Sequence, residues 1–127
     1  MARRAFLHIG TAKSGTTYLQ ELWWRHRATL ADRGLLLPGE ALRDHFHAAA
    51  VLKGMTAVVA ELDEHARGAW TRVLADTAAW SGDVLVSHEH FSDTPAETAS
   101  RALRDLAEAS DEVHLLLTVR DLGRVLP

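Results

Sequence analysis

The chain has 127 residues, of which 47% are hydrophobic and 24% charged, and its 14 Lys and Arg against 17 Asp and Glu give a net charge of −3. This size and apolar content suit one globular domain and argue against disorder. The absence of cysteine excludes a disulfide framework, a cysteine-based zinc site and a thiol nucleophile. The slightly acidic balance argues against electrostatic binding of nucleic acid.

The first half of the chain predicts two strands, each followed by helix. Residues 4–9 form an apolar run that ends at a glycine, which is typical of a buried strand. After a turn rich in Gly, Ser and Thr, residues 16–33 carry apolar side chains at helical spacing. A very short strand is predicted over residues 35–37. Residues 41–80 are rich in alanine and predict mostly helix, interrupted at two glycines.

The second half continues the alternation. A third strand is predicted from Val84, a helix over residues 94–109 and a fourth strand over residues 113–119. Strands that alternate with helices indicate an α/β fold with a short, mostly parallel sheet flanked by helices. Four strands are few for this architecture, and a new element starts before Pro127, so we expect a truncated chain. No signal peptide or transmembrane segment is evident, which predicts a cytoplasmic protein that does not insert into membranes.

The turn after the first strand is the strongest functional signal. In such a fold, ligands bind outside the carboxyl ends of the strands. The segment from Gly10 to Thr17 (GTAKSGTT) lies there and leads into the first helix. Its backbone N–H groups, a lysine and several hydroxyls would converge on one helix amino terminus, which favours an anion such as phosphate. It is not a standard nucleotide-triphosphate loop, because Lys13 precedes Gly15 by two residues instead of following it.

The sequence K-S-G-T-T at residues 13–17 resembles the 5′-phosphosulfate loop of sulfotransferases that use 3′-phosphoadenosine 5′-phosphosulfate (PAPS). Ala12 and Tyr18 stand where that family has proline and tryptophan. The resemblance implies a P-loop-type three-layer fold, with residues 1–127 forming the N-terminal part of a single sulfotransferase-like domain. It implies that Lys13 contacts the transferring sulfuryl group and the bridging oxygen. The residues implied to hold the 5′-phosphate are Ser14, Gly15, Thr16 and Thr17.

A second family feature follows the fourth strand. Sulfotransferases have an arginine at the end of a later strand and a serine eight residues further on, which together hold the 3′-phosphate of PAPS. Arg120 matches the arginine, and the matching serine would come after Pro127. A guanidinium suits this role because its rigid fork binds phosphate through two hydrogen bonds.

Sulfuryl transfer also needs a base that takes the proton of the acceptor. The segment after the third strand offers His88, Glu89 and His90. In the cytosolic sulfotransferases a histidine stands here, and aligning the strands puts Glu89 nearest to it. Ser87 occupies the place of the lysine in the family's K-T-H segment. We therefore rank Glu89 first, then His90 and His88.

A second segment, Asp44–His47, offers further candidates for the base. Heparan-type sulfotransferases place an E-x-H-F-F-like segment in this region, and His45 and His47 rank after Glu89, His90 and His88. If they lay on strands, His45 and His47, or His88 and His90, would share a face and could bind a metal. The resemblance calls for no metal, and we expect none.

The resemblance implies PAPS as co-substrate and a small-molecule or carbohydrate acceptor with a hydroxyl or amine. Neither nucleic acid nor a membrane is expected as a partner. Two alternatives remain at this point. One is a P-loop nucleotide kinase or other phosphotransferase that uses ATP with Mg²⁺, and the other is a non-catalytic fragment that retains the fold.

Overall fold

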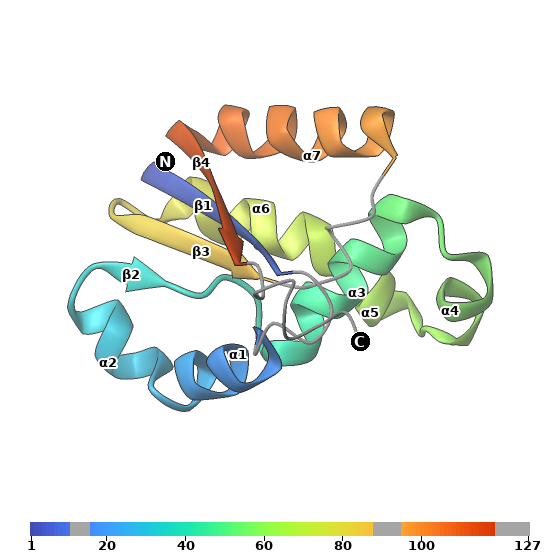
Figure 1. Ribbon diagram of the computed structural model, residues 1–127, viewed down its shortest axis with the longest axis horizontal. Coiled ribbons are helices and arrows are strands. Elements are labelled where there is room, and N and C mark those ends of the chain that lie inside the picture. The colour runs from blue at the N-terminus through green and yellow to red at the C-terminus, as the bar shows by residue number, and fades with distance from the viewer. Residues whose placement is uncertain (11–15, 88–94, 119–127) are drawn as a thin grey trace, which may run out of the picture.

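The fold is built on a parallel sheet. The computed structural model describes residues 1–10, 16–87 and 95–118. Its four strands lie in the order β2-β3-β1-β4, and every neighbouring pair is parallel (Figure 1). The strands are β1 (Ala2–Gly10), β2 (Leu35–Leu36), β3 (Asp83–Ser87) and β4 (Ser110–Thr118). The predicted α/β class with a parallel sheet is confirmed.

Helices fill the connections between the strands. Those in the described part of the chain are α1 (Thr16–Arg25), α2 (Arg27–Asp32), α3 (Leu42–Lys53), α4 (Thr56–Glu61), α5 (Glu64–Arg67), α6 (Ala69–Ala79) and α7 (Ala96–Ala109). The single helix predicted over residues 16–33 is wrong in one respect, because the chain breaks at His26 into α1 and α2. Gly54 ends α3 with a positive φ of 66°, a backbone conformation that glycine adopts without strain.

One face of the sheet carries the main hydrophobic core. Ala5 and Leu7 of β1 and Val84 and Val86 of β3 point to this face, as the two-residue period of a strand requires. The helices α3, α6 and α7 pack against them through mostly small side chains. The residues contributed by these helices are Ala48, Ala49, Leu52, Ala69, Trp70, Val73, Ala102 and Leu106.

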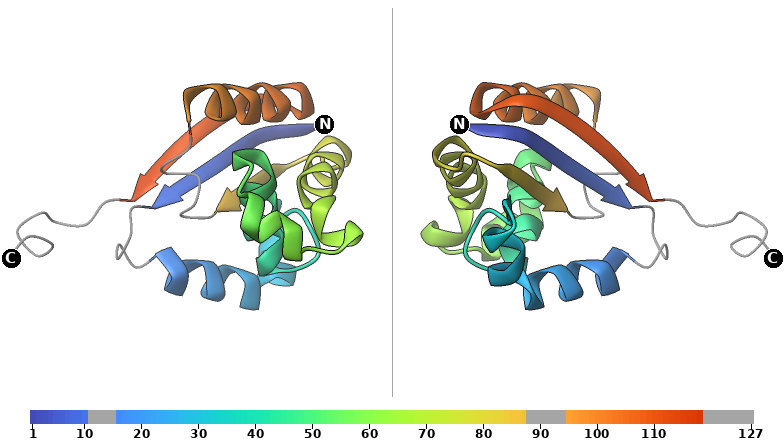
Figure 2. Two further views of the ribbon diagram at one scale, coloured as in Figure 1. Left: turned by 90° about the vertical axis from the view of Figure 1, so that its right-hand side faces the viewer. Right: turned by 90° about the vertical axis from the view of Figure 1, so that its left-hand side faces the viewer.

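The opposite face of the sheet is covered at its carboxyl end by α1. The intervening residues of the strands, among them His8 of β1 and Ser87 of β3, point to this side, and His8 contacts Trp23 of α1. Figure 2 shows α7 and α1 on opposite sides of the strands. Helices therefore flank both faces, which is consistent with a three-layer fold. No helix in residues 16–87 or 95–118 is long and apolar enough to cross a membrane.

A tight junction at the amino end of β3 gives a stability prediction. A Cβ added to Gly82 would lie 2.9 Å from Trp80 Nε1 and closer still to the carbonyl oxygen of Gly34, which accepts a hydrogen bond from Asp83 N. We expect Gly82→Ala to lower the free energy of unfolding by about 1–3 kcal/mol, measured by urea denaturation. Gly68→Ala is the control, because its Cβ would meet its nearest neighbours, Arg72 and the carbonyl oxygens of His65 and Glu64, at ordinary contact distances of 3.4–3.9 Å. Equal urea midpoints for the two variants would contradict the prediction.

Candidate functional site

Most of the residues predicted to form the site belong to three segments that follow neighbouring strands. Thr16 and Thr17 open α1, as expected from the sequence. The other predicted residues lie outside the part of the chain that the structure describes; they are Lys13, Ser14, Gly15, His88, Glu89, His90 and Arg120. The structure does describe the strands that precede these segments in the sequence, β1, β3 and β4, and the helix α1 that follows the first of them.

Of these three strands, β1 lies in the middle. β1 pairs with β3 on one side and with β4 on the other, both in parallel. His8 lies opposite Ser87, and Gly10 lies opposite Thr118. The carboxyl ends of the three strands are therefore neighbours at one edge of the sheet, where parallel α/β proteins bind their ligands.

A buried polar cluster lies at this edge, between β1, β3 and α1. Its members are His8, Gln20 and Ser87, each no more than 3% exposed. Ser87 Oγ lies 2.7 Å from His8 Nδ1 and accepts a hydrogen bond of 3.1 Å from Gln20 Nε2. Burial lowers the pKa of His8, which favours the neutral ring at pH 7. The Ser87 hydroxyl can accept from Gln20 and also donate its own hydrogen to Nδ1 of the neutral His8 ring.

His45 extends the cluster toward α3 and is wholly buried. Ser87 N donates to His45 Nδ1 at 3.1 Å, and His45 Nε2 lies 2.8 Å from the carbonyl oxygen of Pro38. This arrangement requires the neutral ring with its hydrogen on Nε2. Burial lowers the pKa of His45 to about 4. Both ring nitrogens are engaged and neither reaches solvent, so His45 is a structural histidine and not an accessible base.

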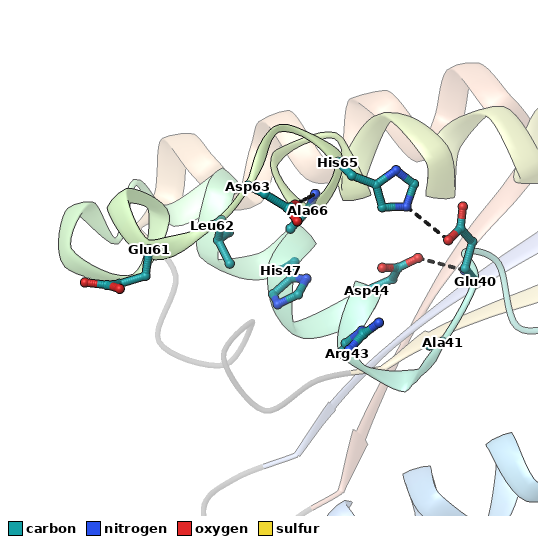
Figure 3. A pocket seen from close by; sticks show the side chains of 10 residues that line it. All are labelled: Glu40, Ala41, Arg43, Asp44, His47, Glu61, Leu62, Asp63, His65 and Ala66. Atoms are coloured by element: carbon teal, nitrogen blue, oxygen red, sulfur yellow. Dashed lines mark hydrogen bonds and ion pairs between the residues drawn. The ribbon is translucent and has the colours of Figure 1, made fainter.

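Asp44 and His47, which belong to the same predicted segment as His45, line a pocket on the side of α3 that faces α4 and α5 (Figure 3). The pocket has a volume of about 260 Å³ and lies between α3 and the α4–α5 region. Burial alone would raise the pKa of Asp44, but hydrogen bonds from Glu40 N and Arg72 outweigh it and lower that pKa. Asp44 is thus held as a carboxylate. Among the residues that the structure describes, the buried His47 Nδ1 has no hydrogen-bond partner.

The condition under which His45 and His47 would share a face, a strand at these residues, is not met. Both lie on α3, and residues two apart on a helix point in different directions. His45 points to the sheet edge and His47 to the pocket. Within residues 1–10, 16–87 and 95–118, no group of three or more His, Asp or Glu side chains is arranged to hold a metal ion.

Sequence reasoning missed the structural role of Gln20 and valued Ser87 only as the position that lacks a lysine. Gln20 lies on the buried face of α1, close to Trp23, which contacts His8 edge-on with ring centroids 5.3 Å apart. A polar residue on the apolar face of a helix was the available signal, since such a side chain needs a buried partner.

No family model, curated protein sequence or solved structure matches the chain. Its functional interpretation therefore depends on the chemistry of the strand-edge residues and on their order along the chain.

Proposed function

We propose that the chain is the N-terminal part of a sulfotransferase that moves a sulfuryl group from PAPS to a hydroxyl or amine. The observation that carries the proposal is that β3, β1 and β4 are adjacent strands of the sheet. The sequence after β1 contains Lys13, the sequence after β3 contains Glu89, and the sequence after β4 contains Arg120. A phosphosulfate loop, a base and a 3′-phosphate ligand would then start from three adjacent strand ends.

Each segment would have a distinct role in binding the co-substrate. The segment 13–17 supplies a lysine, hydroxyls and backbone N–H groups at the amino end of α1, where an anion is stabilised by the helix dipole. In this proposal it holds the 5′-phosphosulfate, and Arg120 holds the 3′-phosphate through two hydrogen bonds. A 3′-phosphate and a 5′-phosphosulfate distinguish this ligand from ATP and ADP.

The proposed reaction is an in-line displacement at sulfur. The acceptor oxygen or nitrogen forms a bond to sulfur while the bond between sulfur and the 5′-phosphate oxygen breaks, and 3′,5′-ADP leaves. Lys13 stabilises the negative charge that develops on the departing oxygen. The acceptor proton passes to a base, for which Glu89 ranks first and His90 and His88 follow. His45 ranks below these residues, because its ring is buried and both of its nitrogens are hydrogen-bonded.

Thermal melts with two nucleotides test the proposal. We expect 3′,5′-ADP at one hundred times its dissociation constant to raise the melting temperature by about 10 °C. ADP with Mg²⁺ should have little effect, because it lacks the 3′-phosphate. Lys13→Ala should abolish the shift. Arg101→Ala is the charge-matched control, because Arg101 is exposed on α7 and pairs only weakly with Asp105 at 3.9 Å.

Two outcomes would contradict the proposal. A larger shift with ADP and Mg²⁺ than with 3′,5′-ADP would favour a nucleotide kinase or another phosphotransferase. A cooperative melt that responds to neither nucleotide would favour a non-catalytic chain that retains only the fold.

A further inference from the structure

We propose that the Ser87 hydroxyl is a positioning group that holds α1, and with it the N–H groups of the first turn of α1, against β1 and β3. The inference rests on the proposed function, because it assigns a role in ligand binding to a side chain that touches no ligand. It adds a residue that the resemblance does not mark, since Ser87 departs from the family pattern.

The first argument is that one oxygen joins three elements. Ser87 ends β3, His8 lies directly opposite it on β1, and Gln20 of α1 donates to the Ser87 hydroxyl oxygen. The Gln20–Ser87 hydrogen bond of 3.1 Å spans 67 residues of sequence and is buried. A buried hydrogen bond is costly to leave unmade, so α1 has one strongly preferred position over the strands.

The second argument concerns the distance from this hydrogen bond to the proposed ligand. Gln20 comes four residues after Thr16, the first residue of α1, and four residues of helix span about 6 Å. A shift of α1 at Gln20 would therefore move the N–H groups of its first turn by a similar amount. Anion binding by such groups depends on their distance and direction, so the Ser87 hydroxyl controls affinity through the placement of α1.

The third argument is that Ser87 is itself fixed from the opposite side. Its N–H donates to His45 Nδ1, and His45 is anchored to the Pro38 carbonyl. The hydroxyl is thus attached to a rigid point. Ser87 is also the last residue before the segment with the candidate bases His88 and Glu89. Ser87 therefore links β3, which precedes the segment with the candidate bases, to α1, which follows the segment with Lys13.

The test compares two buried serines. Ser110 is 3% exposed, its hydroxyl donates to the Leu106 carbonyl at 2.6 Å, and it begins β4 at the opposite end of the sheet. We expect Ser87→Ala to weaken binding of 3′,5′-ADP about tenfold, and Ser110→Ala to leave it within about twofold. Ser87→Thr, which keeps the hydroxyl, should restore most of the affinity. Gln20→Met removes the donor at similar side-chain length and should behave like Ser87→Ala.

Amide hydrogen exchange in α1 supplies a readout that needs no ligand. Exchange at Leu19–Trp24 should be faster in Ser87→Ala than in wild type and unchanged in Ser110→Ala. Equal affinities of Ser87→Ala and Ser110→Ala for 3′,5′-ADP would overturn the proposal, as would unchanged exchange in α1. If wild type fails to bind 3′,5′-ADP, the proposed function falls. Faster exchange confined to Ser87→Ala would then still support the positioning role of Ser87.

Discussion

Replacing His45 with leucine is expected to lower the free energy of unfolding by about 2–5 kcal/mol, because two buried backbone groups lose their partner. These groups are the Ser87 N–H, which donates to Nδ1, and the Pro38 carbonyl, which accepts from Nε2. Leucine has a similar size and no polar atom, so the loss would come from the unpaired groups and not from a cavity.

Urea denaturation at pH 7 measures this effect, with His65→Leu as the matched control. His65 also makes a hydrogen bond through its ring, in this case to the Glu40 carboxylate, but its side chain is 63% exposed. Water replaces its partner, and we expect a change within about 0.5 kcal/mol. If both variants unfold at the same urea concentration, the buried hydrogen bonds of His45 do not stabilise the fold as argued.

The stability of the wild-type protein is expected to fall by about 3 kcal/mol between pH 7 and pH 4, because of His45. Its pKa is about 4 in the folded chain against an ordinary value of 6.5. Between these values the unfolded chain binds more protons than the folded chain, so the free energy of unfolding decreases as the pH falls. Above pH 6.5 this contribution is fully present, and it is lost as the pH approaches 4. The lowered pKa of His8 acts in the same direction.

Urea denaturation at pH 7, 5.5 and 4 measures this dependence. The control is His45→Asn, which does not titrate and keeps an acceptor near the position of Nδ1. We expect its stability to vary less than that of wild type over the same range. The lowered pKa values of Asp44 and Asp83 become important only below their ordinary value of about 4. Equal pH dependence in both proteins would show that another group controls acid stability.

The sequence predicted the order of the strands and helices well because each strand is a local pattern. β1 and β3 are short apolar runs next to turn residues, and such runs have no stable alternative to burial. The break at His26 was missed, because the apolar spacing continues from α1 into α2 without a glycine or proline. The early start of β4 at Ser110 was missed for a similar reason, since Asp111 and Glu112 are poor strand formers by themselves. Pairing with β1 overrides that preference.

The candidate site was less accessible to sequence reasoning. The segments with Lys13, Glu89 and Arg120 could be identified from motifs and their positions after strands, and these assignments stay predictions. The cluster around Ser87 could not be identified, because His8 and Gln20 are 79 and 67 residues away along the chain. Their contact depends on the register of β1 with β3, which a single sequence does not fix. The His45 and His47 side chains likewise point in different directions because they lie on a helix and not on a strand.

The measurement that tests the central claim most directly is a titration of the ¹⁵N-labelled chain with 3′,5′-ADP, followed by the amide chemical shifts. The account predicts saturable shifts concentrated at residues 11–17 and in the first turn of α1, and none of them in Lys13→Ala. Shifts concentrated at the pocket between α3 and α5, or identical shifts in wild type and Lys13→Ala, would contradict it.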